Sequence, residues 1–233
     1  CIRDRYYFYS YFLIEDNNEP INFSVPTGNF GDVYAGYLAK KIGLPINKFI
    51  VATNQNDILH RAITNGAYNV ENVLETISPS MDIQIASNFE RLIFDLNNHS
   101  DKKTIDVMKD IKEKGKYEIQ KENLDKINVD FLSSRMDENE VLNTIKFVYE
   151  KFDKVLDPHS AIGYGAFDKV NLKGNNIVLA TAHPCKFPNA IEKAINIKAE
   201  LPSELAFILD EKENYDILEN NLNKIKQHIK ERI

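Results

Sequence analysis

The segment from residue 21 to residue 53 constrains the fold most. The alternating apolar residues of Ile21–Val25 predict a strand, and the loop Pro26–Asp32 that follows contains two glycines three residues apart. From Val33 to about Ile42, apolar residues recur with the period of an α-helix, and Phe49–Thr53 is a second apolar strand segment. Strand, loop, helix and strand in this order predict a βαβ unit, and therefore a parallel sheet.

Composition narrows the class of protein. The chain has 233 residues, 43% of them hydrophobic and 27% charged, which is enough for a core and unlike a disordered polyelectrolyte. Its 29 Lys and Arg against 35 Asp and Glu give a net charge of −6, so no overall basic field attracts nucleic acid. No apolar run reaches the ~20 residues of a membrane helix. Two cysteines, Cys1 and Cys185, exclude a disulfide scaffold and a Cys-rich zinc site. We expect an α/β protein of a reducing compartment, with neither nucleic acid nor membrane as a partner.

The remaining sequence predicts further helices and strands without an internal repeat or a linker, so one compact unit is expected. The predicted elements are a buried helix at 5–14 ended by the polar residues 15–20, a helix at 81–97, exposed helices over 101–127 broken at Gly115, an edge strand at 130–132, an amphipathic helix at 138–152, a strand at 176–181 and a terminal helix from Asn214.

The loop Pro26–Asp32 is the first candidate for chemistry. Its glycines let successive N–H groups point into one hollow, and the helix that follows adds the partial positive charge of its N-terminus, so an anionic phosphate fits there. The loop has neither a Gly-Lys-Ser/Thr sequence nor the three-glycine dinucleotide pattern, which disfavours a nucleotide-binding domain. A tight turn that binds nothing is an equal alternative. Asp32 fits a phosphate site only if its carboxylate points away or caps the helix.

A second candidate is the strand exit Leu179–Pro188. Thr181, His183 and Lys186 place a hydroxyl, an imidazole and an ammonium group within six residues. The carboxyl ends of strands are where open α/β sheets bind ligands. The alternative is an ordinary strand end with a surface lysine and a turn proline.

A third candidate is the segment Leu156–Gly165. Asp157 before Pro158 predicts the start of a helix that the carboxylate caps. His159 and Ser160 then lie in the first turn, where a bound anion can reach them, although a lone histidine in such a place is more often structural than catalytic. Asp82, paired with Arg91, is interpreted as a surface or capping group.

Taken together, these segments resemble the threonine synthase family of pyridoxal 5'-phosphate (PLP) enzymes, in the tryptophan-synthase-β-like fold type II group. Residues 24–32, followed by Ala35-Gly36, are similar to that family's cofactor-phosphate loop. Further blocks occur in the family's order: Ala52-Thr53-Asn54 with Asn56-Asp57, Ser78–Ile83, Asn88–Arg91, Asp157-Pro158-His159 and Thr181–Pro184. The match runs from about Tyr6 to the C-terminus, and residues 1–5 are interpreted as a scar of cloning or assembly.

The resemblance implies a fold and a set of site residues. Residues 1–233 are expected to form the large, cofactor-phosphate-binding domain of a fold-type-II enzyme with its C-terminal helices, a mostly parallel sheet flanked by helices. The implied cofactor ligands are Gly28, Asn29, Phe30, Gly31, Asp32 and Thr181, and the implied substrate-phosphate ligands are Ser80, His183 and Lys186. The loop residues are expected to act mainly through backbone N–H groups, and Thr181 through its hydroxyl at the pyridine nitrogen. No metal ligand is implied.

The implied activity belongs to a longer protein. The family converts O-phospho-L-homoserine and water to L-threonine and phosphate, with PLP as electron sink, and a cytoplasmic location is expected. Its members carry an N-terminal half whose Phe-Lys-Asp-like lysine forms the Schiff base, and no such stretch occurs here. The chain is therefore interpreted as a C-terminal fragment, inactive without the N-terminal half as its partner. Two alternatives stay open: a threonine-synthase-like phospho-lyase, and a non-catalytic phosphate-binding scaffold domain.

Overall fold

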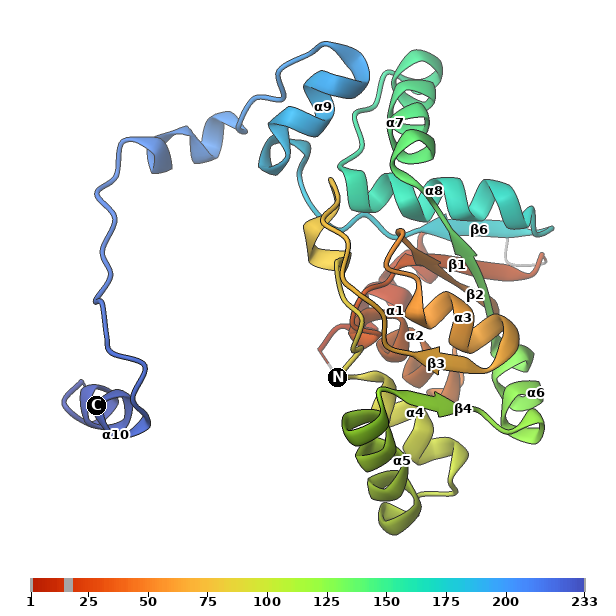
Figure 1. Ribbon diagram of the computed structural model, residues 1–233. Helices are drawn as coiled ribbons and strands as arrows, with labels where there is room; N and C mark the ends of the chain where they lie inside the picture. Colours follow the sequence, from red (N-terminus) through yellow and green to blue (C-terminus); the bar gives the residue numbers. More distant parts are fainter. Residues whose placement is uncertain (1, 15–18, 233) are drawn as a thin grey trace. The chain divides into compact units, whose positions relative to one another are not determined.

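The computed structural model describes residues 2–14 and 19–232, apart from the side chain of Leu209 (Figure 1). The polar residues 15–18, expected to end the first helix, lie outside this range. Residue contacts divide the chain into two units, Cys1–Ala199 and Glu200–Ile233, where the sequence predicts one.

Four parallel strands form the central sheet of the first unit. Their order across the sheet is β5 (Phe131–Arg135), β2 (Ile46–Thr53), β1 (Ile21–Pro26) and β6 (Asn175–Val178). The helix α2 (Gly31–Ile42) connects β1 to β2, which confirms the predicted βαβ unit. Two short strands, β3 (Ala67–Asn69) and β4 (Lys116–Glu118), form a separate antiparallel pair. The predicted mostly parallel α/β sheet is confirmed.

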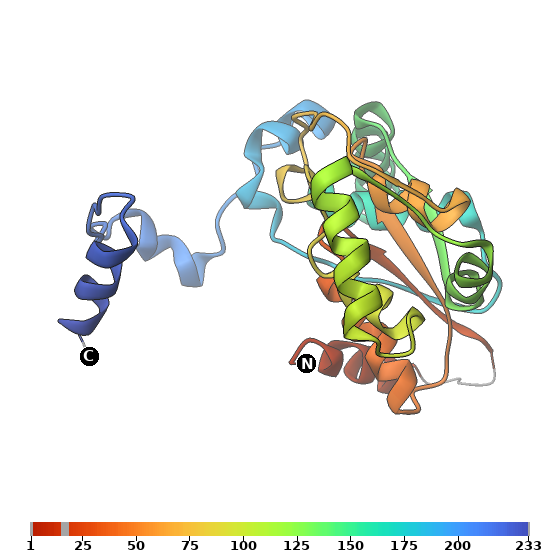
Figure 2. The same cartoon turned by 60° about the horizontal axis from the view of Figure 1, so that its bottom comes forward.

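Helices cover both faces of this sheet (Figures 1 and 2). One face packs against α8 (Pro158–Val170), with α7 (Glu138–Phe152) and α9 (Pro188–Ile195) behind it. The other face shares a hydrophobic core with α1 (Asp4–Phe12), α2, α3 (Ile58–Asn65), α4 (Phe89–Leu96), α5 (Asp101–Lys114) and α6 (Lys121–Asp130).

The side chains of β2 alternate between the two cores. Phe49 and Val51 belong to the core on the α2 side, whereas Ile50 and Ala52 belong to the core on the α8 side. All four side chains are buried. A strand buried on both faces reads as a continuous apolar run, which is why the sequence pattern here is that of a parallel sheet.

Several predicted elements are confirmed, and others are wrong in extent. The edge strand is found as β5, and α7 has the predicted bounds because Asp137 and Glu140 form a reciprocal capping box at its start. The strand predicted at 176–181 ends at Val178, and the terminal helix predicted from Asn214 is α10 (Leu222–Lys230). Asn221 starts α10 by accepting hydrogen bonds from the backbone N–H groups of the next turn.

The helix predicted at 81–97 is confirmed only from Phe89 to Leu96. The 3-10 helix η1 (Pro79–Met81) comes first, irregular chain follows, and α4 begins only at Phe89. Asp82 explains the break, because its carboxylate accepts hydrogen bonds from Asn54, Asn56 and Thr76 at 2.7–2.9 Å. Asp82, interpreted from the sequence as a surface or capping group, has a carboxylate that joins the end of β2 to the segment before η1.

The first helix lies where it is predicted but is not buried. Only Tyr7 is fully enclosed in α1, with its ring 4.9 Å from that of Phe23. Tyr9 and Phe12 are 67% and 73% exposed. The aromatic run therefore presents an apolar face that the described chain leaves uncovered.

The second unit contains the 3-10 helix η3 (Ser203–Leu209) and α10. None of the helices in the described part of the chain combines the length and the apolar character needed to cross a membrane.

Candidate functional site

One cavity of about 810 Å³ lies at the carboxyl ends of β1 and β6. The glycine loop, η1, the first turn of α8 and the chain that leaves β6 form its walls. The lining residues from these segments include Pro26, Thr27, Gly28, Asn29, Phe30, Gly31, Asp32, Ser80, Met81, His159, Thr181, Ala182, Lys186 and Phe187. Arg3, the residue before α1, also lines it together with Tyr6 and Ser10 of α1, although the sequence assigns residues 1–5 no role. Two of the three candidate segments thus meet at one site, and the third adds His159.

The side chains of the glycine loop are committed to contacts outside the hollow. Asn29 accepts a hydrogen bond from the Ser87 hydroxyl at 2.8 Å. Phe30 is buried in the core. Asp32 lies with its Oδ1 3.1 Å from the Tyr7 hydroxyl, which donates to it, so the carboxylate faces α1 as a phosphate site requires.

The backbone N–H groups of the loop have no such partners. Across residues 2–14 and 19–232, no hydrogen bond is donated by the N–H of Gly28, Asn29, Phe30, Gly31 or Asp32. These groups lie in the cavity wall and at the N-terminus of α2, where the helix dipole favours negative charge. The loop therefore has the donors and the electrostatics of a phosphate site.

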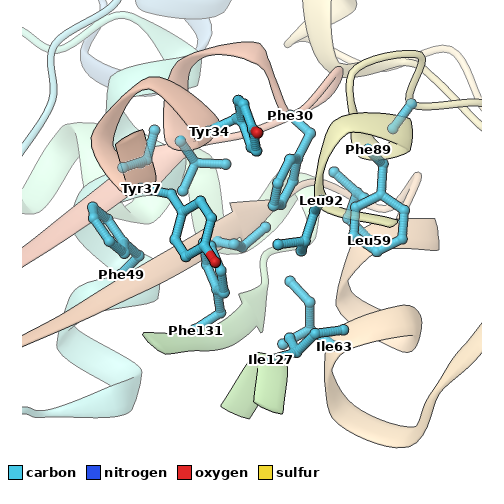
Figure 3. Close-up of a cluster of buried hydrophobic side chains, with 14 of the residues drawn as sticks. Phe30, Tyr34, Tyr37, Phe49, Leu59, Ile63, Phe89, Leu92, Ile127 and Phe131 are labelled. Atoms are coloured by element: carbon cyan, nitrogen blue, oxygen red, sulfur yellow. The ribbon is translucent and has the colours of Figure 1, made fainter. Parts of the chain in front are cut away.

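Phe30 gives the loop its shape. It adopts the left-handed backbone conformation, with φ of 66°, immediately before α2. Its ring packs 5.1 Å from that of Phe89 and 5.7 Å from that of Phe131, among the buried side chains of Figure 3. This packing holds a conformation that L-residues other than glycine seldom adopt.

The two loop glycines are needed for close approach and not for backbone conformation. Neither has a positive φ. A Cβ on Gly28 would lie 3.0 Å from Met81 Cα and 3.0 Å from the Ser80 carbonyl oxygen, whereas a Cβ on Gly31 would meet the Asn88 side chain. The loop is thus seated directly on η1 through Gly28.

Burial raises the pKa of Asp32, against the opposing effects of the Tyr7 hydrogen bond and the Arg3 guanidinium. A carboxylate beside a phosphate site is unfavourable, and a raised pKa makes it easier to neutralise.

The candidate residues after β6 separate into two groups. Thr181 and Lys186 line the cavity together with Ser80. His183 does not line it, because its Nδ1 accepts the backbone N–H of Cys185 at 3.2 Å and caps the 3-10 helix η2 (Pro184–Lys186).

A buried polar network lies behind the cavity wall at the start of α8. Asp157 caps the helix through the backbone N–H of His159 at 2.9 Å, as predicted. Its Oδ1 lies 3.0 Å from His159 Nδ1, and its Oδ2 accepts the Ser160 hydroxyl. Burial raises the pKa of Asp157, but the hydrogen bonds from His159 and Ser160 outweigh it, so the pKa is lowered. His159, expected from the sequence in the first turn of this helix and within reach of an anion, lines the cavity.

Comparisons with known proteins point to one family. A family model for the C-terminal part of threonine synthase matches residues 160–229. The threonine synthase of Pseudomonas aeruginosa is 39% identical over 227 residues, covering 96% of this chain and 48% of that protein. The threonine synthase of Saccharomyces cerevisiae is 41% identical over 212 residues, covering 82% and 41%.

The fold agrees with these sequence relationships. The crystal structure of PLP-bound threonine synthase from Brucella melitensis matches with a TM-score of 0.91 and 40% identity, covering 98% of this chain and 50% of that one. The chain spans about half the length of the curated relatives it matches.

Proposed function

The chain belongs to the threonine synthase family, and from this premise we propose that it forms the part of a threonine synthase that holds the phosphate and the pyridine ring of PLP. The observation that carries the proposal is the row of backbone N–H groups from Gly28 to Asp32, which find no acceptor among the described residues and belong to residues that line one cavity beside a helix N-terminus. The side chains of the same residues have other contacts: Asn29 bonds to Ser87, Asp32 bonds to Tyr7, and Phe30 is buried in the core. This arrangement suits a phosphate dianion bound by main-chain donors.

Thr181 is proposed to contact the pyridine nitrogen. It is exposed and lines the same cavity as the phosphate loop. When bound, PLP supplies an electron sink for removal of protons from the substrate. A threonine hydroxyl donates a hydrogen bond but cannot supply a full proton as a carboxylic acid can, so this chain would leave the ring nitrogen largely unprotonated.

Lys186 and Ser80 are proposed to bind the phosphate of the substrate. Both are exposed side chains of the cavity wall, one cationic and one a hydroxyl donor. His183 stays a weaker candidate, since its ring caps η2 and lies outside the lining.

For the whole protein we propose conversion of O-phospho-L-homoserine and water to L-threonine and phosphate. The lysine that forms the Schiff base is proposed to come from an N-terminal half, so that this chain alone does not turn over. The alternative of a phospho-lyase on the same substrate type uses the same phosphate loop, and product identity separates the two.

Cofactor binding by the 233-residue chain tests the proposal. Isothermal titration with pyridoxine 5'-phosphate avoids reaction of an aldehyde with surface lysines, and pyridoxine without the phosphate is the matched ligand. We expect the phosphorylated ligand to bind at least about tenfold more tightly, with competition by inorganic phosphate. Equal affinity for the two ligands would contradict the assigned loop.

Activity is tested by producing the chain together with the N-terminal portion of the Pseudomonas aeruginosa threonine synthase. Phosphate release and L-threonine from O-phospho-L-homoserine are the expected products, and Thr181→Val should lower turnover. An α-keto acid in place of threonine would favour the phospho-lyase. Phosphate-dependent cofactor binding without turnover in any combination would favour the scaffold domain.

A further inference from the structure

Asp157 lies at the centre of four hydrogen bonds that connect two remote segments of the cavity wall. The backbone N–H of Ser80 donates to His159 Nε2 at 3.3 Å, and His159 Nδ1 lies 3.0 Å from Asp157 Oδ1. On the other side, the backbone N–H of Thr181 donates to the Ser160 hydroxyl oxygen at 3.0 Å, and that hydroxyl donates to Asp157 Oδ2.

The direction of each bond follows from the donors at the two ends. A backbone N–H can only donate, so His159 Nε2 must accept and carries no proton. The neutral ring then has its proton on Nδ1, which donates to Asp157. The Ser160 oxygen accepts from Thr181, and its single proton goes to Asp157. All four bonds therefore point toward one carboxylate.

The three side chains of the network are buried, so water does not compete for their hydrogen bonds. Asp157, His159 and Ser160 are 1%, 4% and 2% exposed. The Phe187 ring, itself part of the cavity wall, packs 4.8 Å from the ring of His159. In such surroundings each hydrogen bond is strong and its loss leaves a buried donor unpaired.

We propose that Asp157 is a positioning residue of the cavity: through His159 and Ser160, its carboxylate sets how far the Ser80 wall stands from the Thr181 wall. This inference rests on the proposed function, because it is the spacing of these walls that would bring the Thr181 hydroxyl to the pyridine ring and Ser80 to the substrate phosphate. Asp157 itself is not proposed to contact the pyridine ring or the substrate phosphate. Its role as a helix cap, which any Asp-Pro start provides, does not require the hydrogen bonds to the His159 ring and the Ser160 hydroxyl.

The chemistry of the site explains why a carboxylate is needed. Asp157 receives the backbone N–H of His159, the ring N–H of His159 and the Ser160 hydroxyl, which are three donors on two acceptor oxygens. An asparagine offers one acceptor oxygen and turns an NH₂ group toward the remaining donors. Asp157→Asn keeps the size of the side chain but should weaken the hydrogen bonds from His159 and Ser160, and so loosen both the Ser80 segment and the Thr181 segment.

Variants that remove only one connection separate the path through His159 to Ser80 from the path through Ser160 to Thr181. Ser160→Ala should disturb the Thr181 amide and leave the Ser80 amide in place. His159→Asn keeps a donor near the Nδ1 position but removes the acceptor of the Ser80 N–H, so it should disturb Ser80 and leave Thr181 unchanged. Asp157→Asn should disturb both. The readout is the ¹H–¹⁵N spectrum of the labelled chain, with the His159 ring nitrogens reporting the Nδ1–H tautomer.

Asp137→Asn is the matched control, because Asp137 caps α7 through the backbone N–H of Glu140 at 2.9 Å and does not line the cavity. It should leave the Ser80 and Thr181 amides unchanged, and the affinity for pyridoxine 5'-phosphate within about twofold. Asp157→Asn should weaken that affinity roughly tenfold, the effect of one net hydrogen bond.

The proposal is overturned if Asp157→Asn affects the amides and the affinity no more than Asp137→Asn does, or if Nε2 of His159 is the protonated nitrogen. Should Asp157→Asn fail to fold, Ser160→Ala and His159→Asn decide the matter, since a structural role alone predicts no separation between the two walls. Absence of pyridoxine 5'-phosphate binding by the unmodified chain contradicts the proposed function, while the amide pattern still tests the positioning role.

Discussion

Phe30 shows how one residue can shape a loop against its own backbone preference. A left-handed conformation costs a residue other than glycine about 1–2 kcal/mol, and Phe30 has φ of 66°. The cost is offset by a ring that is 1% exposed and packs against Phe89 and Phe131. The bend of the loop beside the cavity is thus stabilised from inside the core.

Replacing Phe30 with alanine and with glycine separates the two contributions. Both variants lose the buried ring, at about 3–5 kcal/mol. Glycine in place of alanine ordinarily costs about 0.5–1 kcal/mol, yet Phe30→Gly should be at least as stable as Phe30→Ala, because only glycine accepts this φ freely. Urea unfolding of the pair measures the order, and the same pair at Phe89, within α4, should show the ordinary order. Phe30→Gly less stable than Phe30→Ala would contradict the strain argument.

Asp157 should contribute to the loss of stability in acid. Burial raises its pKa, but the hydrogen bonds from His159 and Ser160 prevail and lower it from the ordinary 3.8. The native carboxylate then binds its proton less readily than the unfolded one, so its contribution is complete above the ordinary pKa and is lost as the pH falls below it.

We therefore expect Asp157→Asn to be less stable than the unmodified chain at neutral pH, with the difference shrinking below about pH 4. Urea midpoints between about pH 2 and pH 7 measure it, and Asp137→Asn is the comparison. A difference that stays constant down to the acid limit would show that the cap, and not the ionised network, is what the variant removes.

For single residues, the sequence predicted the features that depend on a residue's neighbours along the chain. The Asp157 cap could be expected from the Asp-Pro pair, and the turn of the Asp32 carboxylate toward α1 from the conflict of charges in the loop. The left-handed Phe30 could not be predicted, because two neighbouring glycines are the more favourable places for a positive φ. Nor could the turn of His183 toward Cys185, which depends on the 3-10 conformation of the following residues.

Among the elements, the contact between the loop and η1 decides which glycine matters more. A Cβ on Gly28 would meet backbone atoms of Ser80 and Met81 at 3.0 Å, whereas one on Gly31 would meet Asn88 Nδ2, the end of a side chain that can move.

Gly28→Ala should therefore weaken binding of pyridoxine 5'-phosphate by about tenfold or more, and Gly31→Ala by clearly less, because only the first change pushes the loop off η1. Titration calorimetry of the two variants gives the order. Equal losses of affinity would mean that the close contact of Gly28 with the backbone of η1 does not determine how the loop binds the ligand.

The predicted elements differ in accuracy for a physical reason. Helix α7 carries its own start signal and an apolar stripe of Val141, Ile145 and Val148, all buried, so local sequence was sufficient. The segment 81–97 has helical spacing too, but Asp82 is bound by Asn54 and Asn56 from the end of β2. Such long-range hydrogen bonds override a local pattern and cannot be seen in it.

For the whole molecule, the exposed face of α1 is the feature that the first unit does not account for. Tyr6, Tyr9 and Phe12 of α1 and Leu13 just after it are all at least half exposed, and the same helix lines the cavity through Tyr6 and Ser10. Contiguous apolar surface of this kind marks a contact with another polypeptide. The chain spans 48% of the Pseudomonas aeruginosa threonine synthase, and the N-terminal half proposed above is the partner that we propose for this face.

Charge on this face should therefore impair assembly while leaving the phosphate site intact. Tyr9→Glu with Phe12→Glu should reduce the recovery of phosphate release in mixtures with the N-terminal portion of a threonine synthase by about tenfold or more, since two anchors of an interface are lost. Affinity of the chain alone for pyridoxine 5'-phosphate should stay within about twofold, because neither side chain lines the cavity. Val129→Glu, at a residue 64% exposed on α6, is the control and should change neither measurement. Undiminished assembly of the double variant would show that the partner covers some other surface.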